Sequence, residues 1–490
     1  DNADGPTIRF HQIGSSPDKD RDVFGDEFGP GKGLHAELSR DGRKLLVTAY
    51  HGAGATKTEV FYRDLEKGGP FVPVVNDLDA QFSPVFAGEL IVMQTDWKAP
   101  NGRILLLDPE QEQGLERDKW REIIPEQDAA LQSFTLAGGR VFARYLENVR
   151  PRVTYYNLQG ERQGEMRFPD LGSVSSIHGE WERDEAFYSF QSFHLPSTIH
   201  RYRVAAAESS VWNRAEVPFD GSDFTIKQEW HASKDGTRIP MFIVHQKDVK
   251  LDGSHPTLLT GYGGFNISYT PGFSTLAAIW VERGGVFAVA NLRGGGEFGE
   301  RWHAAGMRGN KQNVFDDFIS AAEHLIQLGY TKSSRLAVSG GSNGGLLVGA
   351  TVTQRPDLCR AAICSVPLLD MLRYHKFLVA RFWTPEYGSS ENPTEFKTLH
   401  AYSPYHHVRQ GAKYPAMMFV TGDADTRVDP LHARKMAALM QNATGSDHPV
   451  LLRYDTDAGH IGSMPVHKTI DLLADQLQFL LWSLDVEPAP

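Results

Sequence analysis

One short stretch places a serine among glycines, at Ser339-Gly340-Gly341-Ser342-Asn343-Gly344-Gly345. It follows the apolar run 335–338 and precedes the apolar run 346–350, so we expect a strand, a tight turn and the start of a helix. Gly340-x-Ser342-x-Gly344 fits the G-x-S-x-G nucleophile elbow, in which a strained turn exposes the serine hydroxyl. The helix that follows would direct backbone N–H groups toward an anion formed there. An ordinary glycine-rich turn fits the same residues, so the rest of the chain must decide.

An acid and a base follow later in the chain, each directly after a predicted strand. Residues 421–428 follow the apolar run 416–420 and contain Asp423 and Asp425, and His460 closes the segment after the run 449–454. Functional groups collect at the carboxyl ends of parallel strands, and serine, acid, histidine is the order of α/β-hydrolases. An imidazole can activate a serine hydroxyl, and a carboxylate orients the imidazole. Spacing alone leaves the choice between Asp423 and Asp425 open.

A serine nucleophile also needs two hydrogen-bond donors for the oxyanion, each worth about 3–4 kcal/mol in the transition state. The backbone N–H of Asn343 is one candidate, and the loop after an earlier strand, Gly261-Tyr262-Gly263-Gly264-Phe265-Asn266, is where we expect the second. The glycines of this loop lack G-x-G-x-x-G spacing, which argues against a dinucleotide site. The histidines, His406 and His407 included, show no metal-ligand spacing, so we expect no metal and no cofactor.

The composition limits the classes of partner. The chain has 490 residues, so two domains are expected. Its net charge of −11 argues against nucleic acid or an anionic membrane as a partner. No apolar run approaches the roughly 20 residues that span a bilayer. The two cysteines, Cys359 and Cys364, are interpreted as small buried hydrophobic residues. So few cysteines favour a reducing compartment, and we expect a cytoplasmic protein, with a periplasmic or secreted one as the alternative.

Residues 1–220 have the pattern of an all-β region. Pairs of apolar strands recur roughly every 45–50 residues, which is the period of a propeller blade, so the sequence predicts a partial β-propeller of about four blades. A β-sandwich is the alternative. The pairs are 44–50 with 59–62, 90–93 with 104–107, 140–144 with 153–156, and 186–190 with 199–202.

Residues 221–490 have the pattern of an α/β domain. A hairpin is expected around 233–236, and apolar strands then alternate with amphipathic helices, including a last helix that carries Ile470, Leu473, Leu477 and Leu480. Continuous apolar strands separated by helices predict a mostly parallel sheet covered on both faces. The predicted strands are 256–260, 285–290, 336–338, 416–420 and 449–454.

Several motifs together resemble the prolyl oligopeptidase family of serine peptidases. They extend almost without interruption from residue 225 to the end of the chain, whereas residues 1–220 resemble that family's propeller more loosely. Besides the serine, acid and histidine segments, they are 235–245, 251–256, Gly261-Tyr262-Gly263-Gly264-Phe265-Asn266-Ile267-Ser268, Ala290-Asn291-Leu292-Arg293-Gly294-Gly295-Gly296-Glu297 and Asn310-Lys311-Gln312-Asn313.

The resemblance implies a role for each candidate site residue. Ser342 would be the nucleophile, Asp425 rather than Asp423 the acid, and His460 the base, and the Tyr262 hydroxyl would stabilise the oxyanion beside the Asn343 N–H. Proline in a peptide has no N–H to recognise, so an indole face is a suitable partner. The implied substrate-binding residues are Trp383, which would stack on the proline ring, Arg427, which would bind the preceding carbonyl, and Phe265, Tyr387 and Val428, which would line the pocket.

The expected function is therefore a serine endopeptidase that cleaves short peptides on the carboxyl side of proline through an acyl-enzyme. An oligopeptidase or esterase of different specificity, a peptide macrocyclase that uses the same acyl-enzyme, and a non-catalytic propeller scaffold are the alternatives. Comparison of proline with arginine reporters, mass spectra of the products and labelling of the serine would separate them.

One departure from the family concerns the propeller. The resemblance implies a short N-terminal segment followed by seven blades, whereas here about four blades precede residue 220 and no such segment is recognised. We therefore expect a fragment that lacks roughly 200 residues. Short proline-containing peptides and a missing N-terminal part of the same protein are the expected partners.

Overall fold

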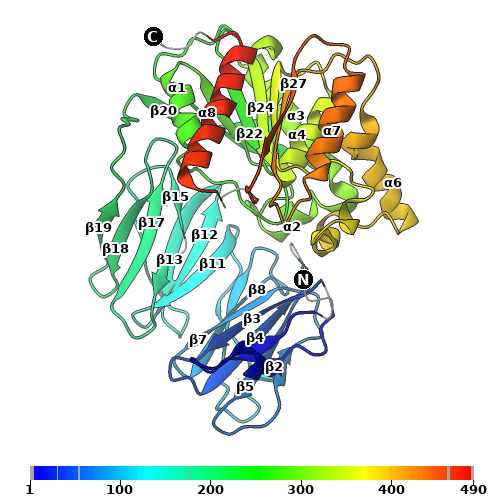
Figure 1. The fold of residues 1–490 in the computed structure, drawn as a ribbon. Coiled ribbons are helices and arrows are strands. Elements are labelled where there is room, and N and C mark those ends of the chain that lie inside the picture. Colours follow the sequence, from blue (N-terminus) through cyan, green and yellow to red (C-terminus); the bar gives the residue numbers. More distant parts are fainter. Residues whose placement is uncertain (1–4, 30, 53–55, 176, 461–463, 487–490) are drawn as a thin grey trace.

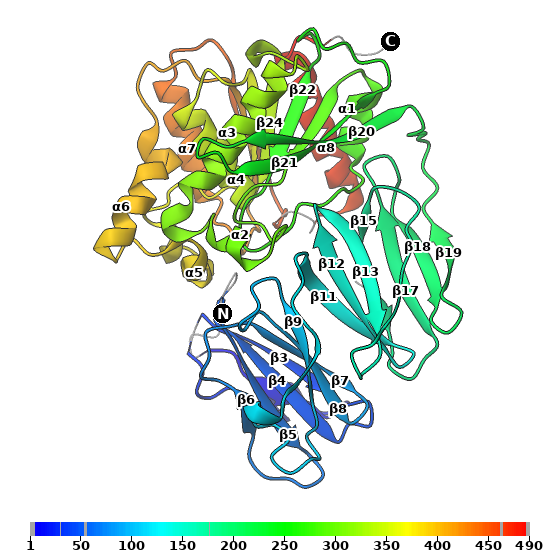
Figure 2. The ribbon, with the colours of Figure 1, turned by 180° about the vertical axis from the view of Figure 1, so that it is seen from behind.

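The computed structural model describes residues 5–29, 31–52, 56–175, 177–460 and 464–486. The described chain contains two assemblies, one built from sheets alone and one built from a large sheet with helices (Figure 1). The helical assembly lies above, the first two four-stranded sheets lie below it and the next two lie beside it, in the views from both sides (Figures 1 and 2).

Four antiparallel sheets of four or five strands follow one another in the first assembly, and the small sheet of β1 (Ile8–Phe10) and β2 (Arg21–Phe24) precedes them. The first sheet contains β3 (Gly33–Leu38), β4 (Lys44–Tyr50), β5 (Thr58–Asp64) and β6 (Val72–Val75). The second contains β7 (Phe82–Ala87), β8 (Leu90–Thr95), β9 (Arg103–Leu107) and β10 (Arg121–Ile124). The third contains β11 (Ala130–Ala137), β12 (Arg140–Glu147), β13 (Arg150–Tyr156) and β14 (Arg162–Glu165). The fourth contains β15 (Ser173–Val174), β16 (His178–Gly179), β17 (Glu185–Gln191), β18 (Thr198–Arg203) and β19 (Glu208–Arg214).

The predicted strand pairs are the two central strands of each sheet, which confirms the prediction of about four blades. Central strands are paired on both sides and packed between neighbouring sheets, so β4 is buried along almost its whole length. Two of the outer strands that were not predicted carry few buried apolar residues: β14 reads Arg-Gln-Gly-Glu, and β19 is exposed throughout.

The second assembly is organised around an eight-stranded sheet. Its strands, in spatial order, are β20 (Phe224–Ala232), β21 (Arg238–Gln246), β23 (Val286–Ala290), β22 (Thr257–Gly261), β24 (Leu336–Gly341), β25 (Ala361–Ser365), β26 (Ala416–Gly422) and β27 (Val450–Asp455). β20 and β21 form the expected hairpin and are antiparallel, and every pair from β23 to β27 is parallel. The mostly parallel sheet is confirmed, and β25 is a strand that the sequence analysis missed.

Helices cover both faces of this sheet. The side chains of β21 alternate between these two faces. Met241 and Ile243 pack in the core beneath α3, α4 and α7, whereas Phe242 and Val244 pack in the core beneath α1 and α8. The helices are α1 (Thr275–Glu282), α2 (Glu300–Ala304), α3 (Gln312–Gln327), α4 (Asn343–Gln354), α5 (Thr384–Tyr387), α6 (Pro393–Tyr402), α7 (Leu431–Ala443) and α8 (Val466–Ser483). Cys359 and Cys364 are free and buried, as expected.

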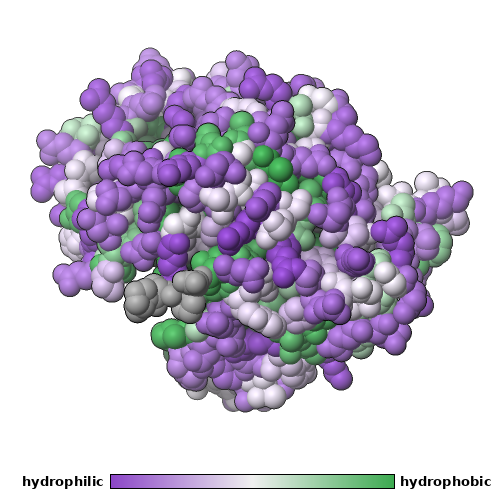
Figure 3. Space-filling model, turned by 90° about the horizontal axis from the view of Figure 1, so that it is seen from above, coloured by the Kyte–Doolittle hydropathy of each residue, from purple (hydrophilic) through white to green (hydrophobic). Residues whose placement is uncertain are grey.

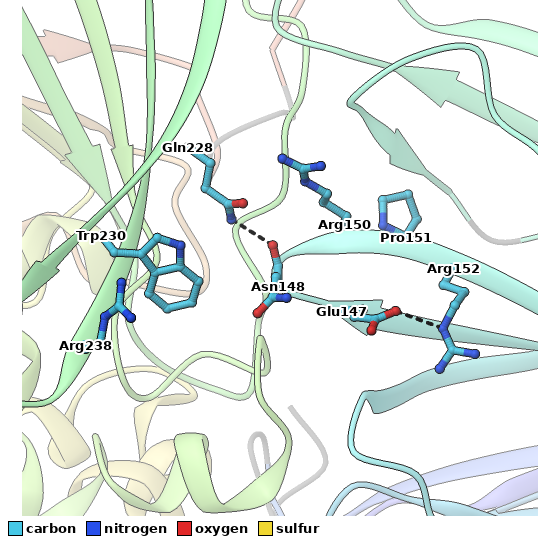
Figure 4. Close-up of a pocket in the computed structure, with 8 residues that line it drawn as sticks. All are labelled: Glu147, Asn148, Arg150, Pro151, Arg152, Gln228, Trp230 and Arg238. Atoms are coloured by element: carbon cyan, nitrogen blue, oxygen red, sulfur yellow. Dashed lines mark hydrogen bonds and ion pairs between the residues drawn. The ribbon is translucent and has the colours of Figure 1, made fainter.

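A hairpin of the third propeller sheet joins the two assemblies. The turn Asn148–Val149 connects β12 to β13, and Val149 is completely buried in the same core as Phe242 of β21. The Asn148 carbonyl accepts a hydrogen bond of 2.7 Å from Gln228 Nε2 of β20 (Figure 4). A hollow of about 610 Å³ lies beside this contact and is lined by Glu147, Asn148, Arg150, Pro151, Arg152, Gln228, Trp230 and Arg238.

A second contact between the assemblies comes from β11. Gln132 Nε2 donates to the Gly296 carbonyl at 3.0 Å, and Gln132 Oε1 accepts from the Ser268 hydroxyl at 3.0 Å. One propeller side chain therefore holds two loops of the other assembly.

The surface is mainly polar. The face seen from above is largely hydrophilic with separate hydrophobic patches (Figure 3). Part of the apolar stripe predicted for the last helix is exposed, because Ile470 and Val466 lie in the first half of α8 and only its second half is packed. Among the described residues, no helix is long and apolar enough to cross a membrane.

Candidate active site

Ser342 occupies the turn between β24 and α4. Its backbone angles are φ 60° and ψ −117°, a conformation that L-residues rarely adopt and that requires its neighbours to be small. A Cβ on Gly340 would lie only 2.2 Å from the Gly344 carbonyl oxygen, so a glycine is required there. The Ser342 N–H donates to the Ser365 carbonyl of β25 at 2.9 Å. The strained strand–turn–helix expected from the sequence is therefore present.

Asp425 and His460 meet at the carboxyl ends of β26 and β27. Asp425 Oδ2 lies 2.7 Å from His460 Nδ1, and Asp425 Oδ1 accepts from the N–H groups of Arg427 and Val428, both at 2.9 Å. The Asp425 side chain is fully buried and that of His460 is 10% exposed. Asp423 makes a different contact, in which its Oδ1 accepts from the Asp457 N–H at 2.7 Å. Of the two aspartates, only Asp425 contacts the imidazole.

This arrangement can orient a general base. Three hydrogen bonds fix the Asp425 carboxylate, and it in turn fixes the tautomer of His460 with Nε2 free to accept a proton. Within the described part of the chain no hydrogen bond joins Ser342 to His460. Such bonds are often long in free enzymes and tighten when a substrate binds.

Tyr262 lies beside Ser342, in the loop after β22. Burial raises the pKa of the Tyr262 phenol, and the Ser342 hydroxyl and the Arg427 guanidinium act against that rise. The phenol is therefore a proton donor at neutral pH. Asn343 Nδ2 donates to the Tyr262 carbonyl at 2.6 Å, and a Cβ on Gly264 would lie 2.6 Å from that same Nδ2. The glycines of this loop thus allow Asn343 to approach its backbone.

The four apolar pocket candidates belong to one cluster. Trp383, Tyr387 and Val428 are buried in the core that lies beneath α4, and the partly buried Phe265 packs against that core. The rings of Phe265 and Tyr387 meet edge to face, with centroids 5.4 Å apart. Arg427 is exposed at the edge of the Asp425 loop. Of these side chains, Phe265 and Tyr387 are in direct ring contact, and Phe265 belongs to the loop that carries Tyr262.

Three charged residues beneath the site were not singled out from the sequence. Glu386 of α5 lies between Trp383 and Tyr387 in the chain, its Oε2 lies 2.8 Å from His303 Nε2, and its Oε1 lies 3.5 Å from Lys311 Nζ. All three side chains are at most 1% exposed. In the sequence, the one indication that Lys311 has a role was its place in the motif Asn310-Lys311-Gln312-Asn313. Its burial could not be predicted, because most lysines lie on the surface.

Among the described residues no group of three or more His, Cys, Asp and Glu side chains could hold a metal ion. The acidic and histidine side chains of the site contact one another or backbone N–H groups instead.

Comparison with known proteins places this chain among peptidases. Residues 1–215 match the model of the prolyl oligopeptidase N-terminal beta-propeller domain, and residues 271–487 match that of the prolyl oligopeptidase family. The chain is 38% identical, over 98% of its length, to the prolyl endopeptidase of Elizabethkingia meningoseptica and covers 68% of that protein. A structure from a study of two prolyl endopeptidases aligns with a TM-score of 0.95 and 44% identity, over 98% of this chain and 70% of the other. Prolyl oligopeptidase B of Galerina marginata, bound to a 35-residue substrate, aligns with a TM-score of 0.92 and 32% identity, over 99% and 69% of the two chains.

Proposed function

This chain belongs to the prolyl oligopeptidase family of serine peptidases, and from this we propose that it cleaves short peptides on the carboxyl side of proline. The observation that carries the proposal is the combination of a serine elbow, an Asp425–His460 pair, and the ring pair of Phe265 and Tyr387, whose tyrosine hydroxyl contacts Asn343 next to the serine. The prolyl endopeptidases to which the chain is similar support the choice of proline.

The proposed chemistry begins with the Ser342 hydroxyl. Its Oγ attacks the carbonyl carbon that follows the proline ring, and His460 Nε2 takes the hydroxyl proton. The imidazolium is stabilised by Asp425, which lies 2.7 Å from Nδ1. When the tetrahedral intermediate collapses, the peptide C–N bond breaks and the amine leaves with the proton from His460. Water then attacks the acyl-enzyme ester, with His460 again as the base, and releases the acid and Ser342.

The oxyanion would be held by Tyr262 and Asn343. Asn343 is the first residue of α4, so its N–H has no acceptor within the helix and is available for an anion. The N–H of Ser342 is already bound to the Ser365 carbonyl, so the second donor must come from another residue. Tyr262 is suited to it because its phenol is partly buried beside Ser342 and stays protonated at neutral pH.

Specificity for proline would come from a flat apolar surface. In the proposal the indole of Trp383 stacks on the pyrrolidine ring, and Phe265, Tyr387 and Val428 form the remaining walls. Arg427 is exposed next to Tyr262 and would donate to the carbonyl that precedes the proline. No acidic side chain is among these pocket candidates, which disfavours a preference for arginine or lysine.

A peptide macrocyclase is the second candidate, because the chain is 33% identical to a dual function macrocyclase-peptidase of Galerina marginata. That activity would use the same acyl-enzyme, with the substrate's own amine in place of water.

The test is turnover of a Gly-Pro amide reporter by the wild type and by Ser342→Ala. We expect Ser342→Ala to lower kcat by at least about 10⁴-fold, because the remaining site keeps only binding and oxyanion stabilisation. Ser210→Ala is the matched control, since Ser210 is exposed on β19, far from the site in the sequence and in the fold.

Three results would contradict the proposal: undiminished turnover by Ser342→Ala, equal kcat/KM for proline and arginine reporters, or a wild type that an active-site fluorophosphonate fails to label. Mass spectrometry of the products from a longer peptide separates hydrolysis from cyclisation.

A further inference from the structure

A buried ion cluster joins α5 to the loop that carries Tyr262. It consists of Glu386, His303 and Lys311, and Glu300 extends it, because His303 Nδ1 lies 3.1 Å from Glu300 Oε1. The neighbouring ring of Tyr387 lies 5.2 Å below the Lys311 ammonium group. Buried charges of this kind are costly unless they are paired, so a cluster in this position needs a physical reason.

The cluster contacts the backbone of the Tyr262 loop at a strained turn. Lys311 Nζ donates to the Gly263 carbonyl at 2.9 Å, and the Phe265 N–H helps to lower the pKa of the nearby Glu386 carboxyl. Gly263 and Phe265 have φ values of 65° and 58°, in the left-handed region that is unfavourable for a phenylalanine. The turn keeps this shape because its polar groups are held from below.

A second route joins α5 to the same loop. The Tyr387 hydroxyl donates to Asn343 Oδ1 at 2.8 Å, and Asn343 Nδ2 donates to the Tyr262 carbonyl at 2.6 Å. The carbonyl groups of Tyr262 and Gly263 are thus both bound by side chains, Asn343 and Lys311, that contact residues of α5.

The ionisation of the cluster supports this arrangement. Burial lowers the pKa of His303, but its contacts with Glu300 and Glu386 outweigh burial and raise that pKa to about 9. Burial raises the pKa of Glu386, and the Lys311 and His303 cations outweigh burial and lower it. Burial lowers the pKa of Lys311, and Glu386 opposes that change. Both basic partners therefore favour the negative charge of Glu386.

We propose that Lys311 is a positioning residue, which fixes the Tyr262 phenol for the oxyanion by holding the Gly263 carbonyl and which ties that loop to the proline pocket through Glu386. The inference rests on the oxyanion role proposed for Tyr262 above. Without the ammonium group, the buried Gly263 carbonyl loses its partner, and the peptide after Tyr262 is free to rotate. Substrate binding does not use that geometry, but the transition state does.

The test is a double-mutant cycle between Lys311 and Tyr262. We expect Lys311→Met to lower kcat for the proline reporter about 10- to 100-fold and to leave KM within about twofold, because a displaced oxyanion donor weakens the transition state alone. We expect Tyr262→Phe alone to lower kcat about 10²- to 10³-fold, because it removes one oxyanion donor. In that background, Lys311→Met should change kcat by no more than about twofold. Lys397→Met, at an exposed position of α6, is the matched control and should keep the kcat of the wild type.

A loss of kcat from Lys311→Met that stays undiminished in the Tyr262→Phe background would overturn the inference, as would a loss confined to KM. Glu386→Gln is the second variant if Lys311→Met does not fold, because glutamine keeps the size of the side chain and an acceptor oxygen and removes only the charge. Its loss of kcat should depend on Tyr262 in the same way, and additive losses would also overturn the inference. A wild type that does not cleave the proline reporter refutes the proposed function, whereas additive losses in an active enzyme refute only the role of Lys311.

Discussion

Glu297 is a buried carboxyl group whose proton matters to the folded state. Its Oε1 accepts from the Tyr269 N–H at 2.9 Å and from Asn291 Nδ2 at 3.3 Å, while its Oε2 has no hydrogen-bond partner among the described residues. Burial raises the pKa of Glu297 to about 7. The Tyr269 ring stacks on the ring of Tyr262, with centroids 6.2 Å apart. The Glu297 carboxyl therefore contacts, through Tyr269, the proposed oxyanion donor.

The raised pKa predicts how stability depends on pH. Between pH 4.5, where the unfolded carboxyl titrates, and about pH 7 the folded state binds a proton that the unfolded state does not bind. The free energy of unfolding therefore falls as pH rises through this window and levels off above it. Between pH 4.5 and pH 8, the free energy of unfolding of the wild type should fall by roughly 3 kcal/mol more than that of Glu297→Gln.

Chemical unfolding of both proteins at pH 4.5 and pH 8 measures this difference. Glu208→Gln, on the exposed strand β19, is the control that should follow the wild type. Parallel pH curves for the wild type and Glu297→Gln would show that the carboxyl does not titrate in this range.

At the level of single residues, the sequence could predict types and order but not contacts. Spacing left Asp423 and Asp425 as equals, because both follow β26 closely; only the folded loop shows one beside His460 and the other beside the Asp457 N–H. The motif that contains Lys311 was visible, but its burial was not, since burial depends on how α3 and α5 approach the Tyr262 loop. The roles proposed for these residues stay predictions.

Among the structural elements, the loop after β23 is held by a buried ion pair. Arg293 Nη2 lies 2.6 Å from Asp317 Oδ1 of α3, and the same guanidinium reaches Asp235 in the β20–β21 hairpin. The Arg293 side chain is 5% exposed and that of Asp317 is fully buried. One arginine therefore connects a loop, a helix and a hairpin behind the site.

Removal of this arginine should destabilise the helical assembly strongly. In Arg293→Met, Asp317 is left as an unpaired buried carboxylate, which costs roughly 3–5 kcal/mol. A fall in the thermal midpoint of the chain measures the effect, with Arg283→Met, exposed after α1, as the control. A midpoint within one degree or so of the wild type would show that Asp317 gains its proton or a new partner at little cost.

For helices and strands too, the sequence predicted the type of an element better than its contacts. Central strands such as β8 and β9 were predicted because they are continuous apolar runs, whereas β25, which reads Ala-Ala-Ile-Cys-Ser, was missed because alanine is a weak strand former. Alternation of strands and helices was enough to predict a parallel sheet covered on two faces. The order of the strands in the sheet is set by the crossovers and was not predicted from the pattern.

At the scale of the molecule, one of the contacts between the assemblies uses an unusual turn. Asn148 and Val149 have φ values of 50° and 63°, the conformation of a two-residue type I′ hairpin. Glycine is the favoured second residue of that turn, and a β-branched valine is an outlier there. Nothing in the local sequence explains a valine at this position; its burial against Phe242 of the other assembly does.

Two substitutions of Val149 should therefore rank in an unusual order. Val149→Ala removes the packing of the side chain and keeps the backbone strain, so it should lower the free energy of unfolding by about 2 kcal/mol. Val149→Gly removes slightly more packing but relieves about 1 kcal/mol of backbone strain. We expect the thermal midpoint of Val149→Gly to lie above that of Val149→Ala, although glycine is normally the less stable of the two. The opposite order would mean that the turn is not strained.

This turn also means that any separation of the two assemblies would involve a local backbone change. Val149 keeps a disfavoured conformation only while its side chain is held by the helical assembly, so separation of the assemblies removes the reason for that conformation. A separated hairpin would relax, and it would have to regain its turn before the valine could enter the core again. Closing is then expected to be slower than simple collision of two preformed surfaces, and Val149→Gly, whose turn needs no such recovery, should remove that delay.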